Sequence, residues 1–520
     1  MTFTNVNKKT TVLIMIGVMV SILLASLDGT IVTTAMPKIV SSLQGFDYYT
    51  WPMIAYLLCI TISMPLFGKL ADVYGFKPVY IFGIIVFLLG SALCGISQNM
   101  MQLIFFRGFQ GMGGAILISN SLAIIGILFA PAERAKYVGI ASSAGALASI
   151  VGPSLGGFIT DNFSWRWVFY VNVPIAIIAF IIIILVLPPH RAEERKKIDY
   201  FGAISLIIAL VPMLLAFTWA GKNYDWNSVQ IIGMLVFSVL MLIVFAVIET
   251  KAEDPIIPMS LFKNFVFNIS AIEMFLISGI LMGGSIFIPL FAQEVIGSSA
   301  SKSGAILTPM MLSLIVGAMI SGLLVSKTNK YKLQAIIGFV ILLIGSVMLL
   351  NLGVNTSNSQ VIIAMIILGF GVGIGMPIFS VTAQSAFSES KIGVVTSSTQ
   401  FFKSLGQTIA SSVLGTIMST AVVNDLKDLN TTGFPASISK VLKNPNALSG
   451  GGDSIKAIAS KLPKEMLPHF MKLIDDIKQI LSNSIHDVFI ICLGMAILGL
   501  IISLFIKEIP LSKTKNSSEL

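Results

Sequence analysis

Long apolar stretches separated by short polar turns run through almost the whole chain. An apolar helix of about twenty residues is long enough to cross the hydrocarbon core of a bilayer. Windows of that length predict fourteen spanning helices, so both ends of the chain are expected on the same side of a membrane. The predicted spans are 11–35, 50–71, 78–97, 102–128, 137–160, 167–187, 200–220, 228–248, 267–291, 303–326, 333–353, 360–385, 393–420 and 485–506.

The composition favours an all-α polytopic membrane protein. Hydrophobic residues make up 55% of the 520 positions and charged residues only 11%, whereas a soluble domain carries roughly 25% charged residues. The net charge of +9 could indicate a nucleic-acid partner, but the basic residues cluster in short loops on one predicted side, which argues against it. The three cysteines, Cys59, Cys94 and Cys492, lie in separate apolar stretches and predict neither disulfides nor a metal site.

The positions of the basic residues predict the orientation. Cytoplasmic loops of membrane proteins are enriched in Lys and Arg, and tryptophans gather at the membrane interfaces. With a cytoplasmic N-terminus, the short outer loops hold only Lys38, Arg166, Lys222 and Lys302, and all five tryptophans lie at the outer interface. We therefore expect cytoplasmic N- and C-termini. The cytoplasmic segments would then hold Lys8, Lys9, Lys69, Lys77, Arg134, Lys136, Arg191, Arg195, Lys196, Lys197, Lys251, Lys263, Lys327, Lys330, Lys332, Lys391, Lys507, Lys513 and Lys515.

The chain also repeats itself weakly, which divides it into two halves. The segment Gly68–Gly75 after the second span resembles Gly322–Asn329 after the tenth, and Arg107–Gly114 in the fourth resembles Leu368–Gly375 in the twelfth. The offsets are 254 and 261 residues. Two six-helix bundles that flank an inserted helix pair account for these offsets. Parallel repeats of this kind place a substrate site between them near the middle of the membrane.

Two polar segments, 188–199 and 421–484, interrupt this pattern and set the expected boundaries. The second is a long segment on the predicted outer side. Its flank near 453–480 has helical apolar spacing, and it lies on the membrane surface, caps an outer opening or forms a loosely ordered loop. The expected parts are an N-terminal six-helix bundle (1–187), a cytoplasmic linker (188–199), an inserted helix pair with its connector (200–262), a C-terminal six-helix bundle (263–507) that includes the long outer segment (421–484), and a cytoplasmic tail (508–520).

Four charged residues stand alone inside predicted spans: Asp28, Arg107, Glu273 and Lys403. A charge at the bilayer centre costs about 2.5–3.5 kcal/mol on insertion scales, so such residues usually face a protein interior or a watery cavity and carry function. At 1.5 Å per residue, Asp28 and Arg107 lie about 10 Å and about 8 Å below the outer ends of their helices. Similar depth allows these two side chains to form an ion pair.

Each of the four has a functional and a structural interpretation. A carboxyl that alternates between a desolvated site and a guanidinium partner can load and release a proton, which makes Asp28 the first candidate for proton coupling. The alternative is a permanent structural ion pair with Arg107. Glu273 is the second candidate for binding a proton or another cation, with a structural role left open. Lys403 is a candidate partner of Glu273, although a structural role is favoured for it.

A turn motif follows the second span. It reads Gly68-Lys-Leu-Ala-Asp72-Val-Tyr-Gly75-Phe-Lys77, in which the glycines permit a tight turn. Asp72 can pair with a cation or cap the N-terminus of a neighbouring helix. The segment resembles the signature loop of the major facilitator superfamily. The resemblance implies a gating role for Gly68, Asp72, Gly75 and Lys77.

Three further stretches resemble one branch of that superfamily, the fourteen-helix drug:proton antiporters of the bacterial quaternary-ammonium and multidrug efflux type. They are Leu27–Pro37 in the first span, Arg107–Ala115 in the fourth, and Gly152–Gly157 in the fifth, which is followed by Trp165–Pro174. The four motifs occur in order, on the appropriate helices and sides. The resemblance implies the major facilitator fold, with two six-helix bundles and two inserted helices.

The fifth-span motif combines Gly152 and Pro153 with Gly156 and Gly157. The proline removes one backbone hydrogen bond, and the glycines let neighbouring helices approach closely. The resemblance implies that this bend controls closure and prevents leak. Tight helix packing alone is the structural alternative.

The resemblance implies a secondary transporter that exports amphipathic, cationic toxic compounds in exchange for protons by alternating access. It further implies a multi-pass protein of the bacterial cytoplasmic membrane. Its partners would be the bilayer, protons and small amphipathic molecules, with no nucleic acid and no cofactor, and a monomer is the expected form. The sequence has no Gly-x-x-x-x-Gly-Lys-Ser/Thr phosphate loop, so the proton gradient rather than ATP is the expected energy source.

The sequence leaves two alternatives to drug export. An exporter of an endogenous lipid or metabolite on the same fold would use 421–484 for hand-off to the cell envelope, and fold analogy alone does not separate it from a drug exporter. A membrane-embedded enzyme or receptor lacks support, because the sequence has no metal-spaced His/Cys set and no Ser-His-Asp arrangement.

Overall fold

The computed structural model is all-α in the residues that it describes, apart from one isolated bridge between Ala220 and Tyr224. It contains fourteen helices long and apolar enough to cross a membrane, which confirms the predicted fold class. Most of the predicted linker, the middle of the outer segment and nearly all of the predicted tail lie outside the described residues. The described residues are 7–43, 51–188, 199–221, 223–298, 306–328, 330–388, 391–427, 429, 466–506 and 508.

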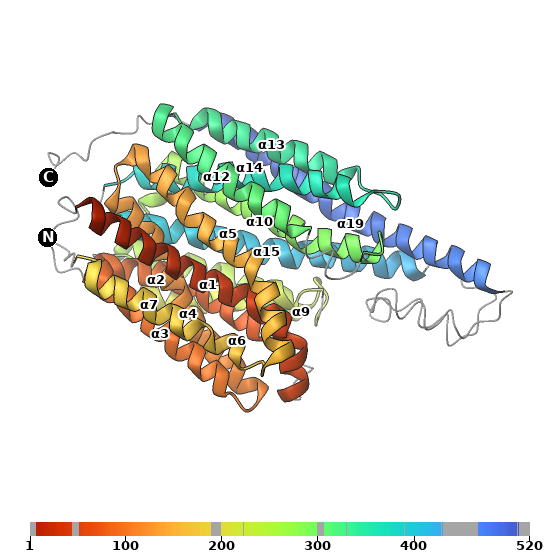
Figure 1. Cartoon of the computed structure of the whole chain (residues 1–520). Coiled ribbons are helices and arrows are strands. Elements are labelled where there is room, and N and C mark those ends of the chain that lie inside the picture. Colours follow the sequence, from red (N-terminus) through yellow and green to blue (C-terminus); the bar gives the residue numbers. More distant parts are fainter. Residues whose placement is uncertain are drawn as a thin grey trace.

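The helices follow one another in chain order, as labelled in Figure 1. The short α6 and α7 together form a single span. The bounds are α1 (Lys8–Leu43), α2 (Trp51–Tyr74), α3 (Phe76–Ile96), α4 (Met100–Leu128), α5 (Pro131–Asn162), α6 (Trp167–Tyr170), α7 (Asn172–Val186), α8 (Tyr200–Trp219), α9 (Val229–Lys251), the short 3-10 helix η3 (Leu261–Lys263), α10 (Phe265–Glu294), α12 (Leu307–Thr328), α13 (Lys332–Leu350), α14 (Asn358–Ser385), α15 (Ile392–Lys427) and α19 (Leu467–Leu504).

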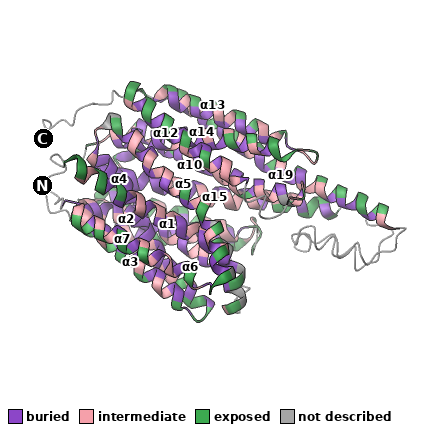
Figure 2. Cartoon of the chain, in the orientation of Figure 1, coloured by how far each residue is buried: buried purple, intermediate pink, exposed green. Residues whose placement is uncertain are grey.

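The spans form two bundles. In the N-terminal bundle, α1 packs against α5 and α7, and α4 packs against α2 and α3. In the C-terminal bundle, α14 packs against α12 and α13, and α10 packs against α15 and α19. Glycines allow close helix approaches: a Cβ added at Gly113 of α4 would come 2.5 Å from the backbone nitrogen of Phe87 in α3. Figure 2 shows buried residues on the packed helix faces and exposed residues along the outer faces.

The two bundles are joined near one end of the molecule. We call the end that holds the start of α1 and the end of α19 the terminal side, and the other end the far side (Figure 1). Near the terminal side, Asp72 of α2 accepts a hydrogen bond of 3.0 Å from the backbone N–H of Val394 in α15. Near the middle of α2, the hydroxyl of Thr61 donates to the hydroxyl of Ser404 in α15 at 3.0 Å. Toward the far side, the ribbons of the two bundles diverge (Figure 1).

A second contact between the bundles runs along α5 and α12, again near the terminal side. A Cβ added at Gly139 of α5 would come 2.6 Å from the carbonyl oxygen of Ala318 in α12. A Cβ added at Gly322 of α12 would come 2.6 Å from the carbonyl oxygen of Ala135 in α5. The two helices therefore cross at a distance that only glycine permits at these positions.

The inserted pair α8–α9 lies beside the seam between the bundles, because α8 packs against both α2 and α15. Glu249 near the end of α9 accepts hydrogen bonds of 3.2 Å from the backbone N–H groups of Ile256 and Ile257. In the same connector, Asp254 pairs with Lys69 of α2 at 3.8 Å. The connector that leads into the C-terminal bundle is thus attached to the terminal end of α2.

Two helices continue beyond the spans that hydropathy predicts. Helix α15 runs to Lys427 and α19 starts at Leu467, so both project past the rest of the bundle on the far side (Figure 1). Their extensions pack on each other through apolar residues that include Val422, Leu426 and Phe470. The part of the predicted flank that the structure describes is therefore a continuation of α19 rather than a separate helix on the membrane surface.

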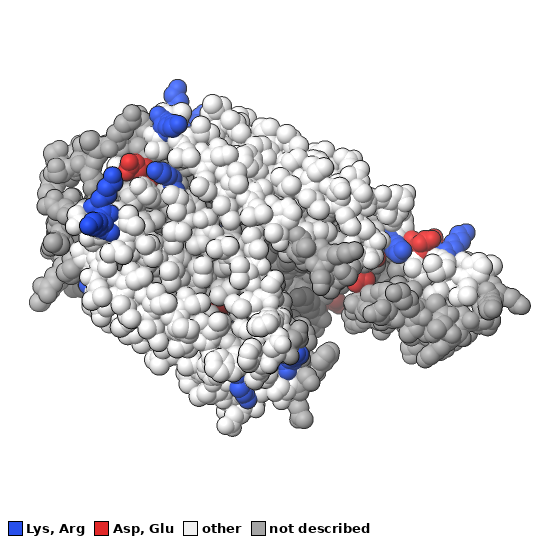
Figure 3. Space-filling view, viewed as in Figure 1, with Lys and Arg blue, Asp and Glu red and all other residues white. Residues whose placement is uncertain are grey.

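The outer faces of the spans are apolar. The apolar window of α9 is only 17% buried inside the protein although its mean hydropathy is 3.1, as expected for a helix that faces lipid. Figure 3 shows Lys, Arg, Asp and Glu gathered at the two ends of the visible face, with a broad uncharged belt between them. This belt is the surface expected to contact the hydrocarbon core of a bilayer.

Candidate functional site

A buried ion pair lies in the interior of the N-terminal bundle. Asp28 is in the middle of α1 and Arg107 in the first third of α4, and their side chains are 0% and 1% exposed. The guanidinium Nη1 of Arg107 donates to Oδ2 of Asp28 at 2.5 Å. The structure therefore brings together the two charges that the sequence predicts at similar depth.

Two amide side chains complete the contacts of the carboxylate. Gln110 of α4 donates from Nε2 to Oδ1 of Asp28 at 2.9 Å, and Asn172 at the start of α7 donates from Nδ2 to the same oxygen at 2.8 Å. Gln110 also accepts from Nη1 of Arg107 at 2.9 Å, and Asn172 donates to the hydroxyl of Ser91 in α3 at 3.2 Å. Asp28 thus receives three donors from two helices other than its own.

Aromatic rings enclose the guanidinium. The Cζ atom of Arg107 lies 4.1 Å from the ring centre of Tyr56 in α2 and 5.9 Å from that of Phe169 in α6. Such cation–π contacts stabilise a desolvated guanidinium. The Tyr56 hydroxyl donates to the carbonyl oxygen of Ala25 in α1 at 3.1 Å, which fixes the ring over the cation. The Nε of Arg107 has no hydrogen-bond partner among the described residues.

Chemically, this arrangement is an acceptor surrounded by donors. An ionised carboxylate only accepts hydrogen bonds, and its two oxygens here face one guanidinium and two amide N–H groups. The geometry therefore fits the ionised form of Asp28. A proton bound to this carboxyl would remove the negative charge that pairs with Arg107, so it would weaken the contact between α1 and α4.

Gln110 and Asn172 were not predicted as site residues. Gln110 lies three residues after Arg107 and so projects from the same region of α4 one turn later, which the helical period could have indicated. Asn172 belongs to a different helix, and only the fold brings it to Asp28. Both lie within the stretches that carry the family resemblance, so the motif was a usable signal.

Glu273 and Lys403 do not form the ion pair considered for them. Glu273 in α10 is 0% exposed, and neither of its carboxylate oxygens has a hydrogen-bond partner among the described residues. The backbone carbonyl of Lys403 in α15 accepts a hydrogen bond of 2.8 Å from the hydroxyl of Ser278 in α10. The two helices are thus in contact at this level, but similar depth did not place the two charged groups face to face.

The turn motif lies at the contact between the bundles. Asp72 accepts from the backbone of Val394 in the first turn of α15, where a negative charge also interacts favourably with the helix dipole. A Cβ at Gly68 would clash with the side chain of Ser397 in α15, so Gly68 permits the close crossing. Gly75 has a φ of 93°, a value that favours glycine, and ends α2 before α3. Lys77 is half-buried in the first turn of α3.

The fifth-span motif lies within α5, which is helical from Pro131 to Asn162. A Cβ at Gly152 would clash with Thr30 of α1, and the Thr30 hydroxyl donates to the carbonyl oxygen of Ala148 at 3.3 Å. The carbonyl oxygens of Gly156 and Gly157 accept from the hydroxyl of Thr160 in the next turn, at 2.8 and 3.0 Å. The Pro153 side chain lies outside the described part of the chain. This motif packs α5 against α1 within one bundle.

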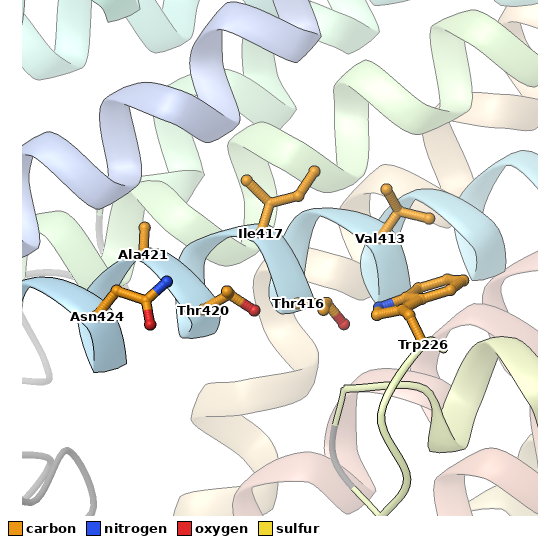
Figure 4. A pocket seen from close by; sticks show the side chains of 7 residues that line it. All are labelled: Trp226, Val413, Thr416, Ile417, Thr420, Ala421 and Asn424. Atoms are coloured by element: carbon orange, nitrogen blue, oxygen red, sulfur yellow. The ribbon is translucent and has the colours of Figure 1, made fainter. Parts of the chain in front are cut away.

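An open hollow on the far side contains none of these residues. It has a volume of about 410 Å³ and lies between α15 and Trp226 of the connector that joins α8 to α9 (Figure 4). Its lining is mainly apolar and carries no charged side chain, so it offers no group for proton transfer. The lining residues are Trp226, Val413, Thr416, Ile417, Thr420, Ala421 and Asn424.

Comparison with known proteins identifies the family. The family model of the Major Facilitator Superfamily matches residues 18–411. The chain belongs to the Major Facilitator Superfamily. Multidrug transporter protein MdtP of Bacillus subtilis (strain 168) is 38% identical over 514 residues, covering 97% of this chain and 94% of that protein. Multidrug resistance protein 3 of the same organism is 36% identical over 520 residues, covering 99% and 98%.

Solved structures of this superfamily share the fold. The proton:xylose symporter XylE, bound to 6-bromo-6-deoxy-D-glucose, has a TM-score of 0.61 at 12% identity and covers 96% of this chain and 97% of its own. The human organic anion transporter MFSD10 has a TM-score of 0.61 at 14% identity, with coverages of 94% and 99%. As a member of the Major Facilitator Superfamily, the protein is a membrane-embedded secondary transporter of small substrates rather than an enzyme. Its resemblance to the fourteen-helix drug-efflux branch is confirmed by the full-length Bacillus relatives.

Proposed function

We propose that this transporter exports amphipathic, cationic compounds from the bacterial cytoplasm in exchange for protons. The observation that carries the proposal is the fully buried ion pair of Asp28 and Arg107, which two amides complete inside a bundle that must rock during transport. An ionisable residue inside a membrane domain is a functional-site candidate by default. The two Bacillus relatives named as multidrug proteins support the substrate class.

The terminal side is the cytoplasmic side in this proposal. The loops expected there hold most of the Lys and Arg residues of the chain, as the positive-inside rule requires. Because the hydrogen bond of Asp72 and the close crossing of α5 and α12 at Gly322 join the bundles near that side, the described conformation is closed toward the cytoplasm. A proton and a substrate would then exchange with the external medium from the far side.

Protonation of Asp28 drives the cycle. The ionised carboxylate holds α1, α4 and α7 together through Arg107, Gln110 and Asn172. A proton that arrives from the far side neutralises Asp28, weakens its bond to Arg107 and permits the bundles to rock. Return to the ionised form on the cytoplasmic side completes the exchange. The membrane voltage contributes about 2.3 kcal/mol per charge per 100 mV to this movement.

The test is export by the Asp28→Asn variant in inverted membrane vesicles. Ethidium and a panel of quaternary amines are supplied under an imposed pH gradient. We expect proton-driven uptake to be abolished, because an amide cannot carry the proton, while the variant still inserts into the membrane. The matched control is Asp225→Asn, which changes an exposed acid in the α8–α9 connector and should leave transport unchanged. Full proton-driven transport by Asp28→Asn would refute the coupling role.

A second candidate function is export of an endogenous lipid or metabolite. The observation in its favour is the extension of α15 and α19 beyond the far side, where they pack through Val422, Leu426 and Phe470 and could receive a molecule leaving the transporter. Replacing 421–484 by a short polar linker separates the two functions. Lipid export would be lost and ethidium efflux retained under the second function, whereas a drug exporter would show no lipid export in either form.

A further inference from the structure

The C-terminal bundle contains an ionisable group that the Asp28 network does not use. Glu273 lies eight residues after the start of α10, about 12 Å along the helix from its terminal end. Its side chain is 0% exposed. Both carboxylate oxygens are buried and have no hydrogen-bond partner among the described residues. Buried polar groups are almost always hydrogen-bonded, so this exception needs an explanation.

Apolar side chains of α14 and α13 lie at the level of Glu273 along the helix axis. One turn further along α10, Ile277 packs against the backbone of Gly375 in α14, because a Cβ added at Gly375 would overlap its side chain. Helices α10 and α14 are antiparallel. Glu273 lies one turn before Ile277 in α10, and Phe379 lies one turn after Gly375 in α14. Glu273 and Phe379 are therefore at the same level along the bundle. The Phe379 ring is fully buried and lies 6.0 Å from the ring of Phe339 in α13. Glu273 therefore lies at the level of an aromatic layer.

No charged group in the described residues compensates a negative charge on Glu273. Helix α14 contains no Asp, Glu, Lys or Arg, and α19 carries none after Asp487. On α15, Lys403 contacts Ser278 through its backbone carbonyl. Its side chain forms no ion pair with Glu273 in the described chain. Lys263 of η3 is exposed on the terminal surface. The other acid on α10 is Glu294, at its far end.

An uncompensated carboxylate in such a setting is strongly unfavourable, with an effective penalty of several kcal/mol. A neutral carboxylic acid avoids this penalty. We propose that Glu273 is a second proton-binding site, which is occupied by a proton in the described conformation and releases it to the cytoplasm when the terminal side opens. This inference rests on the proposed proton-coupled export. In the release step the O–H bond of the acid breaks and the proton passes to water that enters from the terminal side.

The two acids are then in opposite states in one conformation. Asp28 in the N-terminal bundle is ionised and accepts three donors, whereas Glu273 in the C-terminal bundle is neutral and accepts none. Each bundle would carry one proton site, and the transporter would exchange two protons for each substrate molecule. Loss of Glu273 would remove one of the two protons without uncoupling Asp28.

The first experiment detects the proton directly. Purified full-length protein in lipid nanodiscs at neutral pH is examined by infrared spectroscopy for the carbonyl stretch of a protonated carboxylic acid. We expect a band that disappears in Glu273→Gln and persists in Glu294→Gln, the matched substitution on the same helix at a half-exposed position. A spectrum without this band, or a band unchanged in Glu273→Gln, would overturn the proposal.

The second experiment counts protons. Proteoliposomes with the voltage clamped at zero are given a pH difference of one unit, and the equilibrium accumulation of ethidium is measured. Each coupled proton contributes about a tenfold ratio under these conditions, so Glu273→Gln should accumulate ethidium about tenfold less than the wild type and Glu294→Gln should match the wild type. An unchanged ratio in Glu273→Gln contradicts the proposal. A wild-type ratio that depends on sodium would also contradict it, because the site would then bind an inorganic cation.

The two proposals can fail separately. If the wild type accumulates no ethidium or quaternary amine under a pH difference, proton-coupled drug export is wrong for this protein. The infrared band would still decide whether Glu273 carries a proton, because that measurement needs no transport. If transport is proton-driven but the ratio and the band are both independent of Glu273, the second site is wrong and the role of Asp28 stands.

Discussion

At the scale of single residues, the surroundings of two buried acids differ although both lie inside apolar helices. Asp28 meets a guanidinium and two amides, contributed by α4 and α7. Glu273 meets no donor in the described chain. Hydrogen bonds to the remaining groups of a buried ion pair help to offset the cost of burying its charges. Gln110 and Asn172 supply such bonds to Asp28, and this is why we assign them to the site as positioning residues.

Removal of Arg107 tests how far the network depends on the cation. Arg107→Ala leaves a buried carboxylate without its partner, which typically costs about 3–5 kcal/mol. We expect a clear fall in the apparent midpoint of thermal unfolding in detergent. The double variant Asp28→Asn/Arg107→Ala should regain much of the loss, because a neutral amide needs no cation. Arg107→Lys should be intermediate, since an ammonium cannot make both directed donations while stacking on Tyr56. A double variant no more stable than Arg107→Ala would contradict this account.

At the scale of helices, glycines set how closely the two bundles approach. Gly139 and Gly322 place the backbones of α5 and α12 in direct contact near the terminal side, and Gly68 of α2 leaves room for the Ser397 side chain of α15. These crossings have no room for a methyl group. Closure of the terminal side therefore depends on positions that carry no side chain, and a single added carbon is enough to oppose it.

Gly322→Ala tests this dependence. The added Cβ would lie 2.5 Å from Cα of Lys136 and 2.6 Å from the carbonyl oxygen of Ala135, both backbone atoms that cannot move aside alone. We expect the terminal side to open and transport to fall at least tenfold. Closure is measured by disulfide formation in the Thr61→Cys/Ser404→Cys pair, whose hydroxyls are 3.0 Å apart in the native chain.

The control is Gly233→Ala in α9, where an added Cβ meets nothing within 4 Å. Both substitutions raise helix propensity equally, so a difference between them reports the crossing and not the helix. Cys59, two residues from Thr61, is replaced by Ala in all samples. Rapid cross-linking and normal transport in Gly322→Ala would show that the crossing is not needed for closure.

The helices also show what the sequence could and could not predict. Apolar length identified all fourteen spans, because crossing a bilayer demands it. Apolar length did not predict that α15 continues to Lys427 or that α19 already begins at Leu467. The outer turns of these two helices are stabilised by packing on each other rather than by lipid. Hydropathy records how apolar a segment is and contains no information about its packing partner.

The same distinction explains the outcome for the charged residues. Depth along the helices correctly placed Asp28 beside Arg107, since straight helices rise equally per residue. Depth was insufficient for Glu273 and Lys403, whose helices touch through Ser278 while the two charges do not pair. Which face a residue occupies relative to its neighbours depends on the packing of the helices, and the sequence does not give that directly.

At the scale of the whole molecule, the inserted pair connects the two bundles at their shared seam. Helix α8 packs on α2 and α15, and the connector after α9 is joined to α2 by Lys69 and Asp254 before it enters α10. The pair of Lys69 and Asp254 lies near the terminal side and favours its closure. At the far end of α8, the Trp219 ring contacts Trp51 of α2, and the carbonyl oxygen of Ala220 accepts a hydrogen bond from Thr416 of α15. Apart from these contacts of α8, the ribbons of the two bundles diverge on the far side (Figure 1). The direction of export therefore depends on which side of the membrane the terminal side faces.

Labelling with a membrane-impermeant maleimide determines that orientation. Asn223 lies exposed in the α8–α9 connector on the far side, and Ser388 lies exposed in the α14–α15 connector on the terminal side. We expect Asn223→Cys to react in intact cells and Ser388→Cys to react only in inverted vesicles, because the basic loops should remain cytoplasmic. The unmodified protein is the control, since its cysteines lie within spanning helices and two of the three are buried. If Ser388→Cys reacted in intact cells instead, the terminal side would face the external medium. The described conformation, which is closed at the terminal side, would then be open toward the cytoplasm. The same proton gradient would drive uptake of the substrate rather than its export.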